Sequence, residues 1–315
     1  MGLPENRQLK AAAKESILRS ACAPGKLVAL HTAVILVISL LTLVVDLVLE
    51  RQIGNTGGLS GVGTRSVLET VRTVLQYAQL IALPFWQVGW IYATLKIARG
   101  EDAEKKDLLE GFRKFFPFLR LTVLKSLIFT GLALGAVYVA AWIITMFPFA
   151  NSTLDLADPN LTAEALIAAV EPLIVPAAVL SGILALGLCL PFFYRFRMAE
   201  YCLLEDPKAG ARAALRRSGM LMRGNKRKLL QLDVSFWWFW LMAVAVSVLG
   251  WADVLLPWMG IELPWTAEVS CFIAYLLAAA VQLALYYFCK PYLDVTYAHA
   301  YLALLPKEED SYESH

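Results

Sequence analysis

Histidine and charged residues are scarce in this sequence, and their scarcity removes most of the groups that enzyme chemistry needs. The chain has three histidines, His31, His299 and His315, which are too widely scattered to predict a metal site. The sequence contains no Ser-His-Asp set, no HExxH motif, no Walker motif and no metal-spaced carboxylate cluster. We therefore expect a protein that is not an enzyme and that has no catalytic residues, cofactor or metal.

Cysteine is also sparse, and its spacing predicts no site. None of the five cysteines forms a CxxC pair, and none has a neighbouring histidine. Free, reduced thiols are the expected state for such residues.

The low charge accompanies a high apolar content. Charged residues make up 17% of the chain and hydrophobic residues 59%, whereas soluble domains contain about 25% and about 45–50%. This composition indicates a polytopic membrane protein. The net charge of +2 is too small to indicate nucleic acid as a partner.

Six apolar stretches reach the length of about 20 residues that a membrane-spanning helix needs. They run over roughly 27–49, 73–96, 120–147, 172–194, 229–250 and 268–289. The first exceeds the roughly 7–15 apolar residues of a signal peptide, so it predicts a span and not a cleavable signal. The expected fold is all-α, a six-helix transmembrane bundle.

Lysine and arginine predict the orientation of these spans. Of the 28 basic residues, 25 lie in 1–26, 96–125, 195–228 and 290–315, and the others are Arg51, Arg65 and Arg72. The loops 148–164 and 251–267 have none. Because every second loop is basic, we expect both termini on the cytosolic side of a cell membrane, which we take to be bacterial.

A threefold pattern runs through a single membrane domain, 1–305, which an acidic tail over 306–315 follows. Each expected unit, about 8–100, 107–206 and 209–305, begins with a short amphipathic piece and a helix breaker, and a hairpin of two spans follows. The second spans of the three units share a motif, which is Leu83-Pro84-Phe85-Trp86, Leu190-Pro191-Phe192-Phe193 and Lys290-Pro291-Tyr292-Leu293. We expect each proline to open a helix that continues into a polar cytosolic stretch, and we expect the tail to be disordered.

The stretch 209–240 combines an amphipathic helix, a break at 223–226 and the start of the fifth span. A weakly apolar stripe, spaced for one helix face, comprises Ala211, Ala214, Leu215, Ser218, Leu221 and Met222. Seven basic residues, called the basic collar below, are Arg212, Arg216, Arg217, Arg223, Lys226, Arg227 and Lys228. Such a helix is expected to lie flat on an anionic membrane. The alternative is a soluble helix with a solvated charged face.

A second polar group is expected near the cytosolic ends of the last three spans. This polar cluster comprises Arg195, Arg197, Glu200, Asp233, Lys290 and Asp294, with His299 close by in the sequence. Its opposite charges predict either ion pairs that lock surface helices to spans or a site for a lipid headgroup.

The break at 223–226, called the elbow below, and the residues on either side of it resemble a bacterial membrane family labelled domain of unknown function 975. The matching positions are Ser218, Met222, Gly224, Lys226, Leu230, Leu232, Asp233, Ser235 and Phe236. Pro291-Tyr292, Thr296, Ala298 and Tyr301 resemble the closing motif of that family, and Arg99-Gly100-Glu101 and Gly111-Phe112 resemble earlier elements. The family is similar to membrane domains attached to some glycerophosphodiester phosphodiesterases. The resemblance implies membrane location and fold, and it implies no activity.

Two functions remain open from the sequence. The first is a non-enzymatic multi-pass membrane protein whose basic collar binds anionic lipid or a partner protein. The alternative is a permease or exporter component for a small or hydrophobic substrate. Near the expected midplane the polar side chains are Gln87, Ser181 and Gln282, and no carboxylate of the kind that couples transport to ions is expected there. A cavity that reached Gln87 and Gln282 would favour transport.

Overall fold

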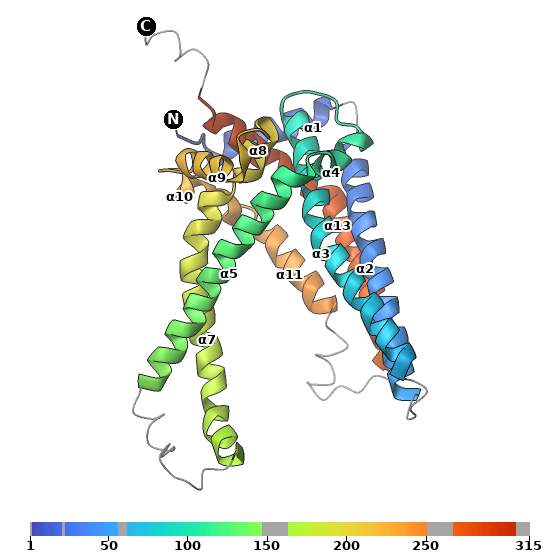
Figure 1. Ribbon diagram of the computed structural model, residues 1–315. Helices are drawn as coiled ribbons and strands as arrows, with labels where there is room; N and C mark the ends of the chain where they lie inside the picture. Colours follow the sequence, from blue (N-terminus) through green and yellow to red (C-terminus); the bar gives the residue numbers. More distant parts are fainter. Residues whose placement is uncertain (1, 21–22, 56–61, 147–162, 251–266, 307–315) are drawn as a thin grey trace. The chain divides into compact units, whose positions relative to one another are not determined.

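Helices make up the regular structure of the described residues, as the sequence predicts. The computed structural model describes residues 2–20, 23–55, 62–146, 163–250 and 267–306 (Figure 1). Over these ranges the chain forms α-helices and a short 3-10 helix, and it forms no strand. Residues 307–315, where the disordered tail is expected, lie outside the described residues.

The chain divides into two compact units. The first unit combines residues 1–115 with 227–315, and the second unit is 116–226. This division cuts across the three repeat units expected at about 8–100, 107–206 and 209–305, and the similarity of those repeats stays a prediction.

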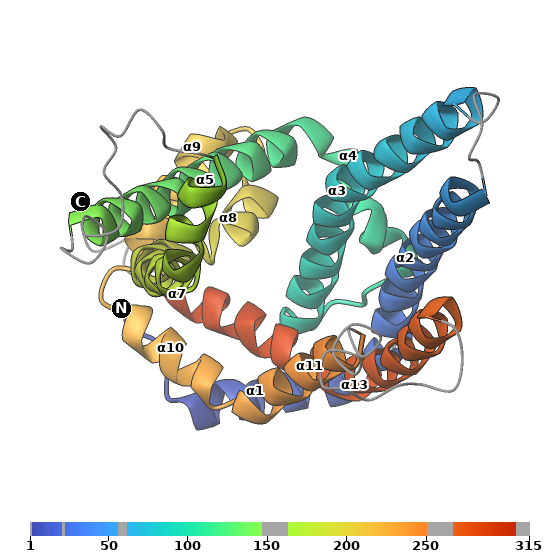
Figure 2. The ribbon, with the colours of Figure 1, turned by 90° about the horizontal axis from the view of Figure 1, so that it is seen from below.

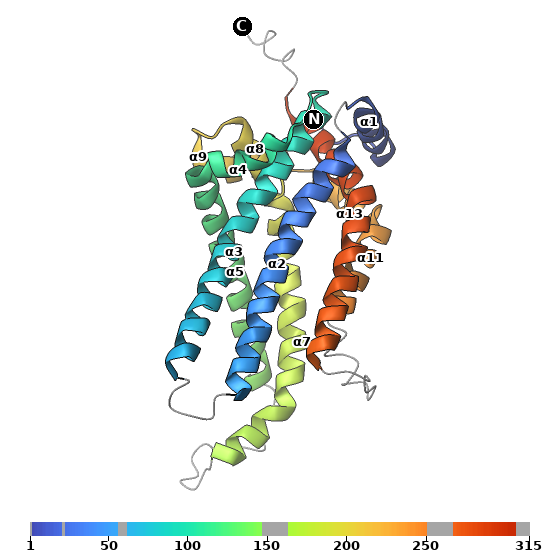
Figure 3. The same ribbon diagram turned by 90° about the vertical axis from the view of Figure 1, so that its right-hand side faces the viewer.

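Three long helices that pack side by side form the body of the first unit (Figure 3). They are α2 (Pro24–Asn55), α3 (Val62–Ala98) and α13 (Ala267–Leu304). Polar side chains bind backbone carbonyls between them: the Tyr275 hydroxyl donates to Leu36 O at 2.7 Å, and Trp86 Nε1 donates to His31 O at 3.0 Å. Such bonds satisfy polar groups where a bilayer offers no water.

Two more helices, α1 (Asn6–Arg19) and α11 (Trp237–Gly250), pack against α13 (Figure 2). The amphipathic helix α1 buries Leu9 and Ala13. Ser16 Oγ and His299 Nε2 lie 2.9 Å apart, within hydrogen-bonding distance. The first helix therefore packs near the end of the last one, so both described ends of the chain lie at the same end of this unit.

Helix α3 also packs against η2 (Lys105–Leu109) and α4 (Glu110–Arg113). The amphipathic piece expected at the start of the second repeat unit, about 107–206, is thus a 3-10 turn followed by one α-helical turn. Two glycines allow backbones to touch here: a Cβ at Gly89 would lie 1.8 Å from Leu108 O, and one at Gly111 would lie 2.0 Å from Phe85 O.

Among the described residues, five helical segments are long and apolar enough to cross a membrane. They are Pro24–Leu49, Glu69–Ala98, Phe115–Ile144, Val175–Glu205 and Phe272–Leu304. A sixth crossing is counted if α10 (Lys226–Val234) and α11, which are bent by 63°, form one broken span. The chain therefore has the helices of a membrane protein, five or six of them long enough to span.

Two expectations about these helices are wrong. Pro84, Pro191 and Pro291 do not open new helices, because each lies inside a helix that continues past it. The fifth span does not run unbroken from residue 229, because the helix stops at Val234 and restarts at Trp237. Proline lacks an N–H and weakens a helix locally, but neighbouring helices can hold such a turn in place.

The break before α11 is stabilised from the N-terminal helix. Lys10 Nζ donates to Ser235 O at 3.1 Å and lies 4.1 Å from the centre of the Phe236 ring. Ser235 Oγ donates back to Leu232 O at 2.6 Å. These contacts satisfy carbonyls that a continuous helix would have bonded internally. Burial lowers the pKa of Lys10, because a charged amine is less stable where water is excluded.

The described residues of the second unit form two long and two short helices. They are α5 (Phe115–Met146, which begins at the boundary), α7 (Ala163–Phe196), α8 (Ala199–Glu205) and α9 (Gly210–Leu221). None of the residues in the most apolar part of 175–205 is buried. Side chains such as Leu127 and Leu186 are about 70% exposed, at 69% and 70%. Such long apolar surfaces indicate contact with lipid.

Candidate functional site

The break between the amphipathic helix and the next helix is where the sequence predicts it. Helix α9 ends at Leu221, and α10 begins at Lys226. Gly224 lies between them with φ of +81°, a left-handed conformation that glycine adopts without the steric penalty of a Cβ.

The apolar stripe of α9 faces the protein itself. Ala211, Ala214, Leu215 and Ser218 are buried, and α9 packs against α8 and α7. The amphipathic pattern is therefore confirmed, but its apolar face is covered by neighbouring helices of the second unit.

Ser218 ties α9 to the junction of α7 and α8. Its hydroxyl donates to Arg195 O at 2.8 Å and accepts from Met198 N at 3.2 Å. The side chain is 0% exposed. A serine in this stripe thus satisfies two backbone groups that the end of α7 leaves unpaired.

The seven residues of the basic collar have different surroundings. Arg217 forms an ion pair with Glu205 at 3.4 Å. Lys226 is half-buried at the start of α10. Arg227 and Lys228 belong to the first unit, where Lys228 Nζ donates to Leu3 O at 2.7 Å.

Arg212, Arg216 and Arg223 are exposed. In the described part of the chain, no carboxylate pairs with any of the three. Their charges are therefore available to an external anion, whereas the charge of Arg217 is already compensated.

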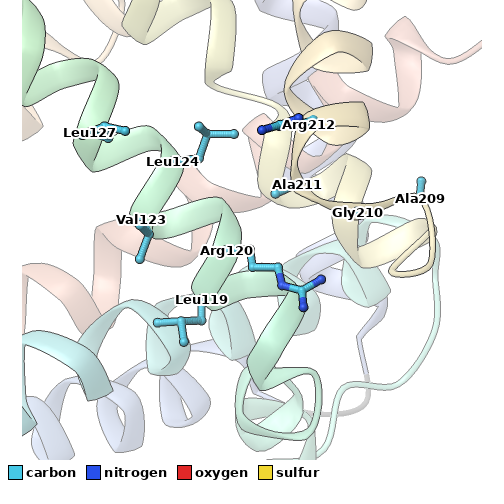
Figure 4. A pocket seen from close by; sticks show the side chains of 9 residues that line it. All are labelled: Leu119, Arg120, Val123, Leu124, Leu127, Ala209, Gly210, Ala211 and Arg212. Carbon is cyan, nitrogen blue, oxygen red and sulfur yellow. The ribbon is translucent and has the colours of Figure 1, made fainter.

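Next to Arg212, a groove of about 600 Å³ separates α5 from the start of α9. Its lining comprises Leu119, Arg120, Val123, Leu124, Leu127, Ala209, Gly210, Ala211 and Arg212 (Figure 4). Arg212 reaches from α9 toward Leu124, and Arg120 extends from α5 on the side of Gly210 (Figure 4). Both charged side chains of the groove are thus cationic, and the rest of its lining is apolar.

The first turn of α9 adds to the positive character of this groove. That turn carries no acidic residue, and its N-cap residue Ala209 makes no side-chain cap; the Asp206 carboxylate, just before it, accepts from Ala209 N at 3.2 Å. The first N–H groups of a helix lack partners within the helix, and the helix dipole is positive at that end.

A model of one protein family matches residues 6–308, which is nearly the whole chain. The family is described as a protein of unknown function (DUF975). The chain belongs to this family. No curated protein matches the chain, and no solved structure matches it. The resemblance seen in the elbow is confirmed, and the similarity to phosphodiesterase membrane domains stays a prediction.

The second-unit part of the polar cluster of this DUF975 protein is engaged in local contacts. Glu200 forms an ion pair with Lys125 and so links α8 to α5. The Arg197 guanidinium lies 5.1 Å from the centre of the Phe193 ring, and Arg195 lies 5.8 Å from that of Phe196.

In the first unit, Lys290 pairs with Asp294 at 3.0 Å. Trp90 Nε1 donates to the same carboxylate at 2.5 Å, which joins α3 to α13. Asp233 accepts a hydrogen bond from the Tyr297 hydroxyl, which joins α10 to α13. These contacts favour the prediction that the polar cluster locks helices together.

Reasoning from the sequence did not single out two residues of interest. Arg120 is one basic residue among the eight of 96–125, and nothing local marks it as part of a groove. His31 is 1% exposed and stacks on Trp86 with 5.6 Å between ring centres. Among the described residues, neither ring nitrogen of His31 has a hydrogen-bond partner. The only sequence signal is the i, i+4 spacing of Trp86 and Trp90, which places both on one face of α3.

Metal or thiol chemistry finds no support among the described residues. No group of three or more His, Cys, Asp or Glu side chains lies close enough there to hold a metal ion. Cys189, Cys202 and Cys289 form no disulfide.

Proposed function

We propose that this DUF975 protein is a non-enzymatic, multi-pass protein of the bacterial cytoplasmic membrane whose basic collar binds anionic lipid. Both termini lie in the cytosol in this proposal. The observation that carries it is the state of Arg212 and Arg216, which are exposed and, among the described residues, have no carboxylate partner. The apolar stripe of the same helix is buried, so its charged side faces outward.

The charges of the collar are sufficient for a measurable attraction to an anionic leaflet. A basic residue close to an anionic leaflet contributes about 1 kcal/mol, and the effect fades over a Debye length of about 8–10 Å. Arg217 is already paired and Lys228 already donates to a carbonyl. Three of the other collar residues would still supply about 3 kcal/mol of attraction.

Native mass spectrometry of the purified protein with mixed phosphatidylglycerol and phosphatidylcholine tests this proposal. We expect the wild type to retain the anionic lipid preferentially and Arg212→Ala with Arg216→Ala to retain less. Arg51→Ala with Arg65→Ala, which removes two charges from the loop predicted to lie outside, is the matched control and should behave as wild type. Equal retention of both lipids by the wild type would contradict lipid binding and would leave an acidic partner protein as the ligand of the collar.

A second candidate, a permease or exporter component, draws on one observation. A cavity of about 310 Å³ between α11 and α13 is lined in part by Gln282, Tyr275 and Ser247. Gln87, the other glutamine expected near the midplane, is not part of its lining.

Labelling of a cysteine in this cavity separates the two functions. Ala278 lines the cavity, and Ala278→Cys in a cysteine-free background can be treated with a charged, water-soluble thiol reagent from either side of sealed vesicles. A permease requires access from both sides in turn. Labelling from one side alone, or from neither, would contradict transport through this cavity.

A further inference from the structure

We propose that the groove between α5 and α9 holds a single anionic phospholipid, with its phosphate between Arg120 and Arg212 and an acyl chain along Val123 and Leu127. This inference rests on the proposed lipid binding and assigns it one site. A volume of about 600 Å³ lies within the range of about 300–1,000 Å³ that is usual for small-molecule sites.

The groove lies at the depth where a phospholipid changes from polar to apolar. Helix α9 has 12 residues, about 18 Å at about 1.5 Å per residue, so it is too short to cross a hydrocarbon core of about 30 Å. Its exposed arginines place it at the surface. Helix α5 carries Arg120 and Lys125 near its start, and no further charged residue follows before Met146. The wall from Leu119 to Leu127 therefore begins at headgroup level and enters the apolar layer.

The charges at the groove select for an anion. Lys125, the other basic residue of this part of α5, is paired with Glu200. Arg120 and Arg212 have no carboxylate partner among the described residues. Two uncompensated guanidinium groups attract a phosphate and repel the quaternary ammonium of a choline headgroup. The site should therefore prefer phosphatidylglycerol over phosphatidylcholine.

The apolar lining identifies a lipid and not a free anion as the occupant. Val123 and Leu127 are 57% and 69% exposed, and further along the same helix Leu134 is 64% exposed. The groove therefore continues into the lipid-facing surface of α5, so an acyl chain can enter sideways from the bilayer. A soluble phosphate would contact the two arginines and leave this lining without an apolar partner.

Single substitutions of the two arginines test the headgroup half of the site. We expect Arg120→Ala and Arg212→Ala each to lower the affinity for phosphatidylglycerol about fivefold, the change that corresponds to about 1 kcal/mol. Lys105→Ala is the control, because Lys105 is an exposed basic residue that lies outside both the collar and the groove. The measurement is native mass spectrometry in detergent with graded phosphatidylglycerol and 0.5 M ammonium acetate, which shortens the Debye length and weakens diffuse attraction.

Filling the groove tests the acyl half without changing a charge. Val123→Trp should fill the groove and so abolish retention of the one lipid that the wild type keeps at high salt. Val137→Trp, on the same helix and 53% exposed at the wild-type valine, should retain it. If Arg120→Ala fails to fold, Arg120→Gln and Val123→Trp give the same comparison, with monodispersity on gel filtration as the folding check.

Three results would overturn the groove site. The first is equal lipid retention by Val123→Trp and Val137→Trp, and the second is an equal effect of Arg120→Ala and Lys105→Ala. The third is displacement of the retained lipid by millimolar glycerol 1-phosphate, which would show that the site binds a soluble phosphate group. A low-salt preference for phosphatidylglycerol that survives Val123→Trp would leave the collar proposal intact while the groove site failed. If the wild type shows no preference for phosphatidylglycerol at low salt, the proposal that the collar binds anionic lipid is itself contradicted.

Discussion

At the scale of single residues, burial decides which polar side chains matter to stability. Ser218 bonds two backbone groups of the α7–α8 junction and is fully buried. By contrast, the Ser181 hydroxyl donates only to Ala178 O of its own helix. The same side chain therefore has a tertiary role at one position and a local one at the other.

Ser218→Ala should destabilise the protein by about 1–3 kcal/mol, because the Met198 N–H loses its partner in a buried place. Ser181→Ala is the matched control in the same unit and should change stability by less than about 0.5 kcal/mol. Thermal unfolding in detergent, followed by tryptophan fluorescence, measures both. Equal melting temperatures of the two variants would refute the role assigned to Ser218.

At the scale of elements, close backbone contact docks η2 and α4 onto α3. Gly89 and Gly111 supply the two points of contact, where no side-chain atom fits. Lys96 and Asp107 add an ion pair at 3.0 Å, with the Asp107 side chain only 8% exposed. The segment that leads from α3 to α5 is therefore held against α3 itself.

Gly89→Ala should destabilise this docking strongly, because the new Cβ would lie 1.8 Å from a backbone oxygen that cannot turn aside. Overpacking typically costs about 1–3 kcal/mol and more where backbone must shift, so we expect a large loss of folded protein on gel filtration after mild heating. Gly131→Ala and Gly135→Ala are the controls, since nothing lies within 4 Å of a Cβ at either position. Both should be neutral or stabilising, because alanine is the better helix former by about 1 kcal/mol. A Gly89→Ala protein as stable as these controls would disprove the close contact.

At the scale of the whole molecule, long exposed apolar helices indicate a membrane protein, and the spacing of its basic residues predicts an orientation. In the part of the chain that the structure describes, five helical segments are long and apolar enough to span, and the bent α10–α11 pair makes six if it counts as one span. The count matters for topology: an odd number of crossings separates the termini, and an even number keeps them together. In the first unit α1 packs against α13, where Ser16 meets His299, which supports the even count.

Reporter fusions test this topology. Fusions after Lys106 and Gly224 should report a cytosolic location, and fusions after Gly58 and Pro159 an external one, because basic loops stay in the cytosol. Alkaline phosphatase and green fluorescent protein at each position give opposite readings. An external signal at Gly224 would overturn the orientation and, with it, the access of the collar to the cytosolic leaflet.

The sequence by itself determined the features that arise from local physics. Apolar runs located the spanning helices, the 3.6-residue period located α9 with its buried face, and Gly224 located the break, because few other residues adopt its positive φ. The same local logic failed at Ser235 and at the three prolines. There the helix breaks or continues according to contacts from other helices, such as Lys10 on Ser235 O.

Only the tertiary structure decided which charges are free. Arg212 and Arg217 look alike in the sequence, but Glu205 compensates the second and, among the described residues, no carboxylate compensates the first. Arg120 joins Arg212 at one groove only because α9 returns to the start of α5. A side chain's partners are set by long-range packing, which periodicity and composition do not encode, so the groove could not be read from either segment alone.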